Sequence, residues 1–179
     1  MPVLVAAVTV VGALCLIDLL LTMGVIRRLR EHTEMITRLN VPEVPVIGLA
    51  AGESPAPFSA VTVSGVPVSG PAGLRLAAFF SSSCSMCPER VPPFIQYLAD
   101  HKIAKEHVLT VVLGSDDEPP AYLDRLAEVT LACAHGEDSD VAKAFKAVGF
   151  PAFCLLNADG AVLATSYDPA MLPEPAMAR

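Results

Sequence analysis

The chain has 179 residues, a formal net charge of −7 and a hydrophobic fraction of 53%. This length fits one domain of ordinary size with an additional segment, and the hydrophobic fraction exceeds that of most soluble domains. The part beyond residue 40 holds more acidic than basic side chains and no basic cluster, which argues against nucleic acid as a partner. Five cysteines are too few for a scaffold held together by disulfides.

The first hydrophobic segment, residues 3–26, contains a single charge, Asp18. As a helix with a rise of about 1.5 Å per residue, it crosses a hydrocarbon core of about 30 Å with some tilt. A cleaved signal peptide has a basic start and a shorter apolar core, whereas Met1 and Pro2 carry no side-chain charge. We therefore expect an uncleaved transmembrane anchor with a basic flank over residues 1–30.

The residues after the expected anchor are first basic and then rich in proline. Arg27, Arg28 and Arg30 follow the span directly, and the positive-inside rule taken alone places the rest of the chain in the cytoplasm. Residues 31–57 have the composition of a juxtamembrane segment and a Pro/Gly linker, with prolines at 42, 45, 55 and 57.

Residues 58–167 carry the pattern of one α/β domain. Residues 58–68 predict a short hairpin that turns at Ser64-Gly65. The run 74–80 is nearly all apolar, which is typical of a strand covered on both faces.

Directly after this strand comes Cys84-Ser85-Met86-Cys87, followed by an amphipathic helical pattern. Two intervening residues let one helical turn bring both sulfurs together. The first thiol then lies at a helix N-terminus, where unpaired N–H groups and the helix dipole favour the thiolate. Such a thiolate attacks a disulfide, and the second cysteine resolves the mixed disulfide. The motif therefore predicts a redox-active dithiol.

The same spacing also occurs as half of a zinc site, which needs a second close pair of ligands. The remaining cysteines, Cys15, Cys133 and Cys154, are isolated in the sequence, and the histidines form no such pair. The pattern favours redox chemistry over structural zinc, and we expect no metal site.

Helices and strands alternate after the motif. The first helix has an inward apolar stripe made of Cys87, Val91, Phe94, Ile95 and Leu98. A strand is predicted at 108–113 and another at 131–133. Between them, a helix is predicted near Pro120, and its apolar face holds Leu123, Leu126 and Ala127.

The next helix is expected to begin at a cap formed by Asp138 or Ser139 and to end at Gly149 as its C-cap. Its predicted inward residues are Val141, Ala144, Phe145 and Val148. A strand at 150–156, a turn at 157–160 and a strand at 161–166 follow. The whole gives βαβαβαββ, with parallel strands first and an antiparallel last pair. Residues 168–179 form a Pro-rich tail that we expect to be partly disordered.

Three motifs in order carry a resemblance: Cys84-Ser-Met-Cys87, Gly149-Phe-Pro151-Ala-Phe and Asn157-Ala-Asp-Gly160. They resemble thioredoxin-fold proteins, and more narrowly the membrane-anchored bacterial thiol–disulfide oxidoreductases of the TlpA and MauD type. The resemblance covers roughly residues 50–167. It implies an α/β thioredoxin-like fold, in which a central mixed sheet is flanked by helices and preceded by an N-terminal β-hairpin.

The resemblance also implies roles for individual residues. Cys84 becomes the attacking thiol and Cys87 the buried resolving thiol. The cis-proline of the family maps onto Pro151, which with Phe150 is expected to position the backbone of the substrate. No cofactor is implied, only client protein disulfides or dithiols and a redox partner that resets the pair. Members of this type hold the catalytic domain outside the cytoplasmic membrane, so we expect a single-pass protein with an extracytoplasmic domain.

The chain departs from thioredoxins in three places. Thioredoxins carry Trp just before the first cysteine, where Ser83 stands here, and a buried acidic residue in the preceding strand, which residues 74–80 lack. Glu89 is the nearest carboxylate, and it is expected to be a solvated residue of the first helical turn. The Ser-Met dipeptide differs from the Gly-Pro of thioredoxin, which leaves the direction of electron flow open.

Two other functions use the same cysteines. A metal-handling module would carry copper or zinc on Cys84 and Cys87, with Met86 as a further soft ligand for copper. A peroxiredoxin-like peroxidase fits less well, because it needs a lone peroxidatic cysteine. Cys133 and Cys154 are expected to be buried apolar residues. The alternative for Cys154 is a third redox thiol, and the alternative for Cys133 is a weak metal site with His135.

Overall fold

The computed structural model describes Gly12 and residues 47–114, 119–136 and 138–175. The predicted transmembrane anchor and most of the linker lie outside these residues, apart from Gly12. Among the described residues, no helix combines the length and the apolar character that a membrane crossing requires. The strands and helices below all belong to the unit formed by Val44–Arg179.

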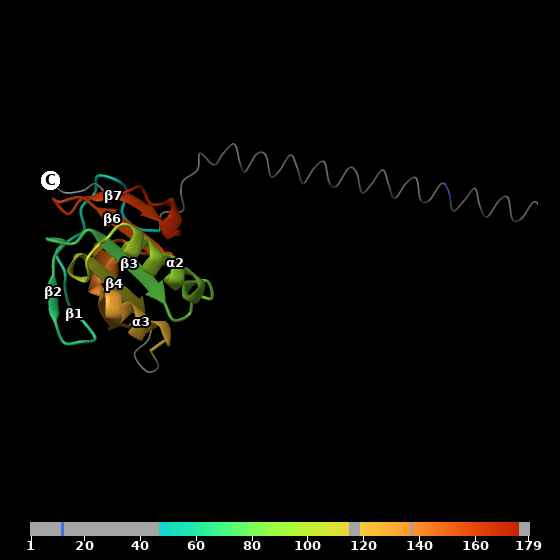
Figure 1. The fold of residues 1–179 in the computed structure, drawn as a ribbon, viewed down its shortest axis with the longest axis horizontal. Coiled ribbons are helices and arrows are strands. Elements are labelled where there is room, and N and C mark those ends of the chain that lie inside the picture. The colour runs from blue at the N-terminus through green and yellow to red at the C-terminus, as the bar shows by residue number, and fades with distance from the viewer. Residues whose placement is uncertain (1–11, 13–46, 115–118, 137, 176–179) are drawn as a thin grey trace, which may run out of the picture. The chain divides into compact units, whose positions relative to one another are not determined.

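A five-stranded mixed sheet forms the centre of the domain, with the strand order β5-β4-β3-β6-β7 (Figure 1). The three parallel strands and the antiparallel pair occur where the sequence predicts them. The parallel strands are β3 (Leu76–Ser81), β4 (Val108–Leu113) and β5 (Leu131–His135). The antiparallel strands are β6 (Ala152–Leu156), which pairs with β3, and β7 (Val162–Ser166). β3 and β4 are buried along their whole length, as strands covered on both faces should be.

A separate two-stranded hairpin precedes the sheet. β1 (Ser59–Val61) pairs antiparallel with β2 (Pro67–Ser69). Its turn contains Gly65 at φ +80°, a backbone conformation that glycine adopts without a steric penalty. The predicted hairpin is therefore confirmed.

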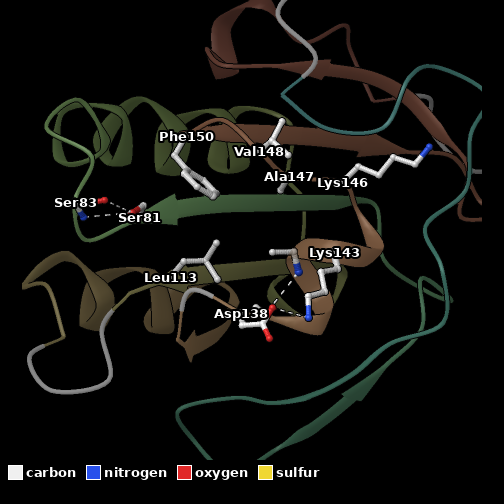
Figure 2. Close-up of a pocket in the computed structure, with 11 residues that line it drawn as sticks. Ser81, Ser83, Leu113, Asp138, Lys143, Lys146, Ala147, Val148 and Phe150 are labelled. Atoms are coloured by element: carbon white, nitrogen blue, oxygen red, sulfur yellow. Dashed lines mark hydrogen bonds and ion pairs between the residues drawn. The ribbon is translucent and has the colours of Figure 1, made fainter.

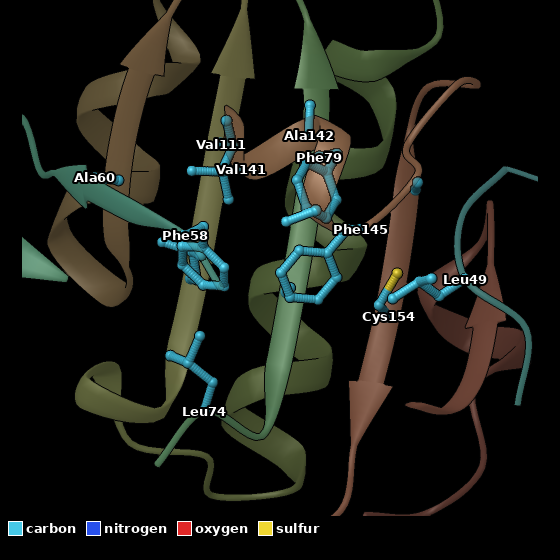
Figure 3. Packing of buried hydrophobic residues seen from close by; sticks show 14 of the residues in the cluster. Leu49, Phe58, Ala60, Leu74, Phe79, Val111, Val141, Ala142, Phe145 and Cys154 are labelled. Carbon is cyan, nitrogen blue, oxygen red and sulfur yellow. The ribbon is translucent and has the colours of Figure 1, made fainter. Parts of the chain in front are cut away.

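Helices cover both faces of the sheet. On one face, α2 (Cys87–Asp100) and α3 (Tyr122–Val129) pack over Phe80 and Phe153. On the other face, α4 (Asp140–Ala144) and the chain near Phe58 pack over Phe79 (Figure 3). The ring of Phe145, just after α4, lies 5.2 Å from that of Phe79 and 5.6 Å from that of Phe58. Because successive side chains of a strand point to opposite faces, Phe79 and Phe80 serve the two cores separately.

The helix before β6 is shorter than predicted. Ser139 is its N-cap and accepts a hydrogen bond from the Ala142 amide, as expected, but the C-cap is Phe145 and not Gly149. Val148 is 75% exposed, so its predicted inward position is wrong. The chain leaves the helix after Ala144 and turns back, and a Cβ on Gly149 would lie 2.9 Å from Cγ2 of Ile47.

The described part of the tail packs against α2. Asp168 caps the short 3₁₀ helix η2 (Pro169–Met171) and pairs with Arg90 of α2 at 2.6 Å. Leu172 is buried in the core beneath α2, and the hydroxyl of Tyr97 donates to the Pro173 carbonyl at 3.0 Å. Contacts with α2, which no local sequence pattern predicts, hold this part of the tail in place. Residues 176–179 lie outside the described part.

Candidate active site

Cys84 and Cys87 are joined by a disulfide at the start of α2, with their Cα atoms 5.4 Å apart. β3 ends at Ser81, and the amide of Cys84 donates to the Ser81 carbonyl at 3.2 Å. The amide of Cys87 donates in turn to the carbonyl of Cys84 at 3.2 Å. These two turns carry the chain from the buried strand into the helix and bring the sulfurs together, as the spacing predicts.

The two cysteines differ in their exposure. Cys84 is partly exposed, whereas Cys87 is fully buried in the core between α2 and the sheet. Phe80, Val91 and Phe94 belong to the same buried cluster as Cys87. A large partner can therefore approach Cys84 from solvent but has no direct route to Cys87.

Phe150 lies against Cys84, although 66 residues separate the two in the sequence. The Phe150–Pro151 peptide bond is cis, as the resemblance implies. β6 begins at Ala152, which pairs with Phe79 of β3, and this register brings the preceding residues next to the end of β3. The Sγ atom of Cys84 lies 3.5 Å from the Phe150 carbonyl oxygen.

Hydroxyl groups hold the loop between β3 and α2. The side chains of Ser81 and Ser83 share a hydrogen bond of 2.9 Å, and Ser82 donates to the carbonyl of Gly114. The buried hydroxyl of Tyr122 donates to the Ser81 carbonyl at 3.2 Å. Burial raises the pKa of Tyr122, which keeps this hydroxyl protonated as a donor. Sequence reasoning missed these roles, and the run of three serines was the only local sign of them.

Glu89 is exposed in the first turn of α2, as its position in the sequence predicts. A solvated carboxylate there complements the helix dipole. Glu89 therefore does not supply the buried acidic group that thioredoxins carry near the second cysteine.

Cys133 and Cys154 are fully buried and form no disulfide. Both belong to the core on the α4 side of the sheet, whereas Cys87 belongs to the core on the α2 side. Desolvation raises the pKa of each thiol to about 11. These surroundings favour the expected apolar role for Cys154 over a third redox thiol.

Groups of three His, Cys, Asp or Glu side chains that could hold a metal ion do not occur among the described residues. His135, the partner considered for Cys133, lies at the end of β5, and its Nε2 is buried without a hydrogen-bond partner within the described part of the chain. Among the described residues, no third ligand accompanies Cys133 and His135.

A pocket of about 450 Å³ opens beside the disulfide. Ser81 and Ser83 lie at one end, and Phe150 and Leu113 face the same space from opposite sides (Figure 2). The rest of the lining comes from α4 and the residues after it: Asp138, Ser139, Ala142, Lys143, Lys146, Ala147 and Val148. No local pattern predicts this pocket, because its walls come from three separate parts of the chain: residues 81–83, Leu113 and residues 138–150.

Charged groups at the pocket are paired with one another. Lys143 lies 2.6 Å from Asp138 and 3.7 Å from Asp140, and these carboxylates raise the pKa of Lys143. Lys146 lies 2.8 Å from Glu53 and holds the pKa of that carboxyl below its usual value. The ion pairs leave the lining mainly apolar and hydroxylic.

No protein-family model and no curated protein matches the chain. Solved structures do match it. The thioredoxin domain of a thiol-disulfide oxidoreductase from Bacteroides vulgatus aligns with a TM-score of 0.52 and 20% identity, covering 66% of this chain and 89% of that one.

Two further structures give the same result. A thiol:disulfide interchange protein from Bacteroides sp. aligns with a TM-score of 0.51 and 19% identity over 68% of this chain and 86% of that one. A thiol-disulfide oxidoreductase from Bacteroides fragilis aligns with a TM-score of 0.51 and 18% identity over 63% and 89%. Together with the strand order and the placement of Cys84 and Cys87, these likenesses show that the chain has the thioredoxin-like α/β fold.

Proposed function

We propose that the chain is a thiol–disulfide oxidoreductase that exchanges disulfides with client proteins through Cys84 and Cys87. One observation carries the proposal: a partly exposed Cys84 is bonded to a fully buried Cys87 at the start of α2. This asymmetry fits a reaction in which one sulfur meets the client and the other completes the exchange. The structurally similar proteins from Bacteroides vulgatus and Bacteroides fragilis are thiol-disulfide oxidoreductases, which supports the same function.

In the reducing direction, the thiolate of Cys84 attacks one sulfur of a client disulfide. The client S–S bond breaks, one client cysteine leaves as a thiolate, and a mixed disulfide to Cys84 forms. Cys87 then loses its proton and attacks the Cys84 sulfur, which releases the second client thiolate. The client gains two electrons and Cys84–Cys87 becomes a disulfide. The oxidising direction runs the same steps in reverse.

The buried position of Cys87 determines the order of these steps. Because only Cys84 is open to solvent, the mixed disulfide forms on Cys84, and Cys87 stays within one turn of it. The Phe150 carbonyl, 3.5 Å from the Cys84 sulfur, offers a backbone acceptor to the client segment next to its cysteine. The reaction needs no cofactor, only a redox partner that returns the pair to its starting state.

The proposal includes a membrane tether. Residues 3–26 form the single-pass anchor, residues 31–57 provide the linker, and the catalytic domain lies outside the cytoplasmic membrane. The hydrophobic segment and the resemblance to the TlpA and MauD type support this arrangement, while the arginines after the span favour the opposite orientation. Accessibility of Glu89→Cys to an impermeant thiol reagent on intact cells tests the side of the membrane.

A redox titration of the full-length chain in glutathione buffers tests the chemistry. Alkylation and peptide mass spectrometry count free thiols at Cys84 and Cys87 in each buffer. We expect one reversible two-electron transition, and its midpoint decides between reductant and oxidant. Cys84→Ser and Cys87→Ser should each abolish the transition, whereas Cys154→Ala should retain it. A pair that never closes, or that holds copper or zinc in fixed proportion, would support the metal-handling alternative instead.

A further inference from the structure

We propose that the pocket beside Cys84 receives an uncharged aromatic side chain from the client, next to the client's reactive cysteine. The inference rests on the proposed function, because it assumes that a client forms a mixed disulfide with Cys84. It adds a substrate class to that function, since it states which sequences around the client cysteine react fastest.

The pocket adjoins the reacting sulfur. Ser83 lines it and directly precedes Cys84, and Phe150 lines it while its carbonyl oxygen lies 3.5 Å from the Cys84 sulfur. An extended chain advances about 3.3–3.6 Å per residue. A residue next to the client cysteine in the mixed disulfide therefore reaches the pocket without further movement of either protein.

The walls suit a flat apolar group. The side chains of Phe150 and Leu113 face each other across the space, and Ala142, Ala147 and Val148 complete the apolar lining (Figure 2). Val148 is 75% exposed, which leaves a valine of the pocket uncovered by the domain itself. Small residues at the serine end keep the space open, and a volume of about 450 Å³ admits a phenyl, phenol or indole ring.

The charges argue for an uncharged ligand. Lys143 lies beside Asp138 and Asp140, and Lys146 extends away from Phe150 and Leu113 towards Glu53 (Figure 2). Both lysines are more than half exposed and already lie against carboxylates, so a charged group in the pocket gains little from them. A ring gains apolar contact with the lining.

The test uses short peptides in which a single cysteine carries 5-thio-2-nitrobenzoate as a mixed disulfide. The residue before or after the cysteine is Trp, Ala or Glu. The reduced full-length chain attacks the peptide sulfur and releases the coloured thiolate, whose absorbance gives a second-order rate constant. We expect the Trp peptide, at one of the two positions, to react about tenfold faster than the Ala peptide, and the Glu peptide to gain nothing.

Two variants fill the pocket from different sides, Ser83→Trp from the loop and Ala147→Trp from the segment after α4. Either folded variant should bring the Trp-to-Ala ratio close to one. Glu89→Trp is the matched control, because it adds the same side chain at an exposed position near the dithiol but outside the lining, and it should keep the ratio. Equal rates for all peptides, or a ratio unchanged by both filling variants, overturn the pocket assignment. Failure to react with any peptide overturns the proposed function instead.

Discussion

The four described cysteines of this chain occupy two kinds of surroundings. Cys84 reaches solvent at the start of α2, whereas Cys133 and Cys154 lie in the interior of β5 and β6 with no exposed surface. The thiolate is the reactive form of cysteine, and burial in apolar surroundings disfavours it. The same side chain therefore supplies redox chemistry at one place and apolar packing at another.

Alkylation of the reduced, folded chain should separate these cysteines. With pKa values near 11, the Cys133 and Cys154 thiols hold about a hundredfold less thiolate at neutral pH than thiols at the ordinary value of 9. We expect iodoacetamide to label Cys84 first and to label Cys133 and Cys154 only after unfolding in guanidinium. Peptide mass spectrometry gives the rates. Labelling of Cys154 in the folded state at the rate of Cys84 would contradict its apolar role.

Thr110 offers a second test of how burial acts on a single group. It is fully buried in β4 between Ala78 and Ala132, and its hydroxyl has no hydrogen-bond partner among the described residues. A buried hydroxyl without a partner destabilises the fold, so Thr110→Val should raise the free energy of unfolding by about 1 kcal/mol.

Thr130 is the matched control for this change. It is 1% exposed, and its hydroxyl donates to the Leu126 carbonyl at 2.8 Å. Thr130→Val should therefore lower the free energy of unfolding by about 1 kcal/mol. Urea unfolding of both variants measures the two effects, and changes of the same sign at Thr110 and Thr130 would refute the assignment of the unpaired hydroxyl.

The glycines of the two hairpin turns share a backbone conformation but differ in what surrounds them. Gly65, between β1 and β2, has φ +80° and open space where a Cβ would stand. Gly160, between β6 and β7, has φ +82°, but a Cβ there would lie 2.9 Å from Cβ of Pro71. Both turns require a left-handed residue, and only the second is also packed against another part of the chain.

Substitution by alanine should separate the penalty of the left-handed backbone conformation from the cost of the contact with Pro71. Gly65→Ala carries the conformational penalty alone, and we expect it to lower the free energy of unfolding by about 1 kcal/mol. Gly160→Ala adds the collision with the rigid ring of Pro71, so its loss should be about 2–3 kcal/mol. Thermal or urea unfolding compares them. Equal losses would show that Pro71 moves aside freely.

Secondary-structure elements could be predicted from the sequence where they depend on residues close together in the chain. The apolar runs of β3 and β4, the Ser139 cap and the Cys84–Cys87 spacing each depend on a few neighbouring residues, and the structure has them. The end of α4 was not predictable from the helical pattern, because Lys146 adopts φ +51° and the Phe145 carbonyl accepts from the amide of Leu49, about a hundred residues away. The pocket beside Cys84 was missed for the same reason, since Leu113 and Val148 meet only in the folded chain.

The segments at the two ends of the domain each cover one of its two hydrophobic cores. The segment before β1 covers the core on the α4 side, where the amide of Leu49 donates to the Phe145 carbonyl at 3.0 Å. The tail after β7 covers the core on the α2 side through Leu172. These segments add to what the helices cover on the two faces of the sheet.

The tail is tied to the active-site helix by an ion pair whose strength can be measured. Arg90 and Asp168 are 2.6 Å apart, with side chains 27% and 20% exposed. In a double-mutant cycle with Arg90→Gln and Asp168→Asn, we expect a coupling of about 0.5–1 kcal/mol, falling with added salt because the pair is only partly buried. Asn at 168 keeps an acceptor for the Ala170 amide, so the cycle isolates the charge.

The pair of Lys143 and Asp138 is the matched control, because it has the same 2.6 Å separation but side chains 58% and 87% exposed. Water competes for both of its partners, so the equivalent cycle should show no measurable coupling. If the two cycles agree, burial adds nothing to the Arg90–Asp168 contact, and apolar packing of Leu172 holds the tail on α2. If only the first pair couples, the tail takes part in positioning the helix that begins at Cys87. Loss of the pair should then also shift the midpoint of the Cys84–Cys87 titration.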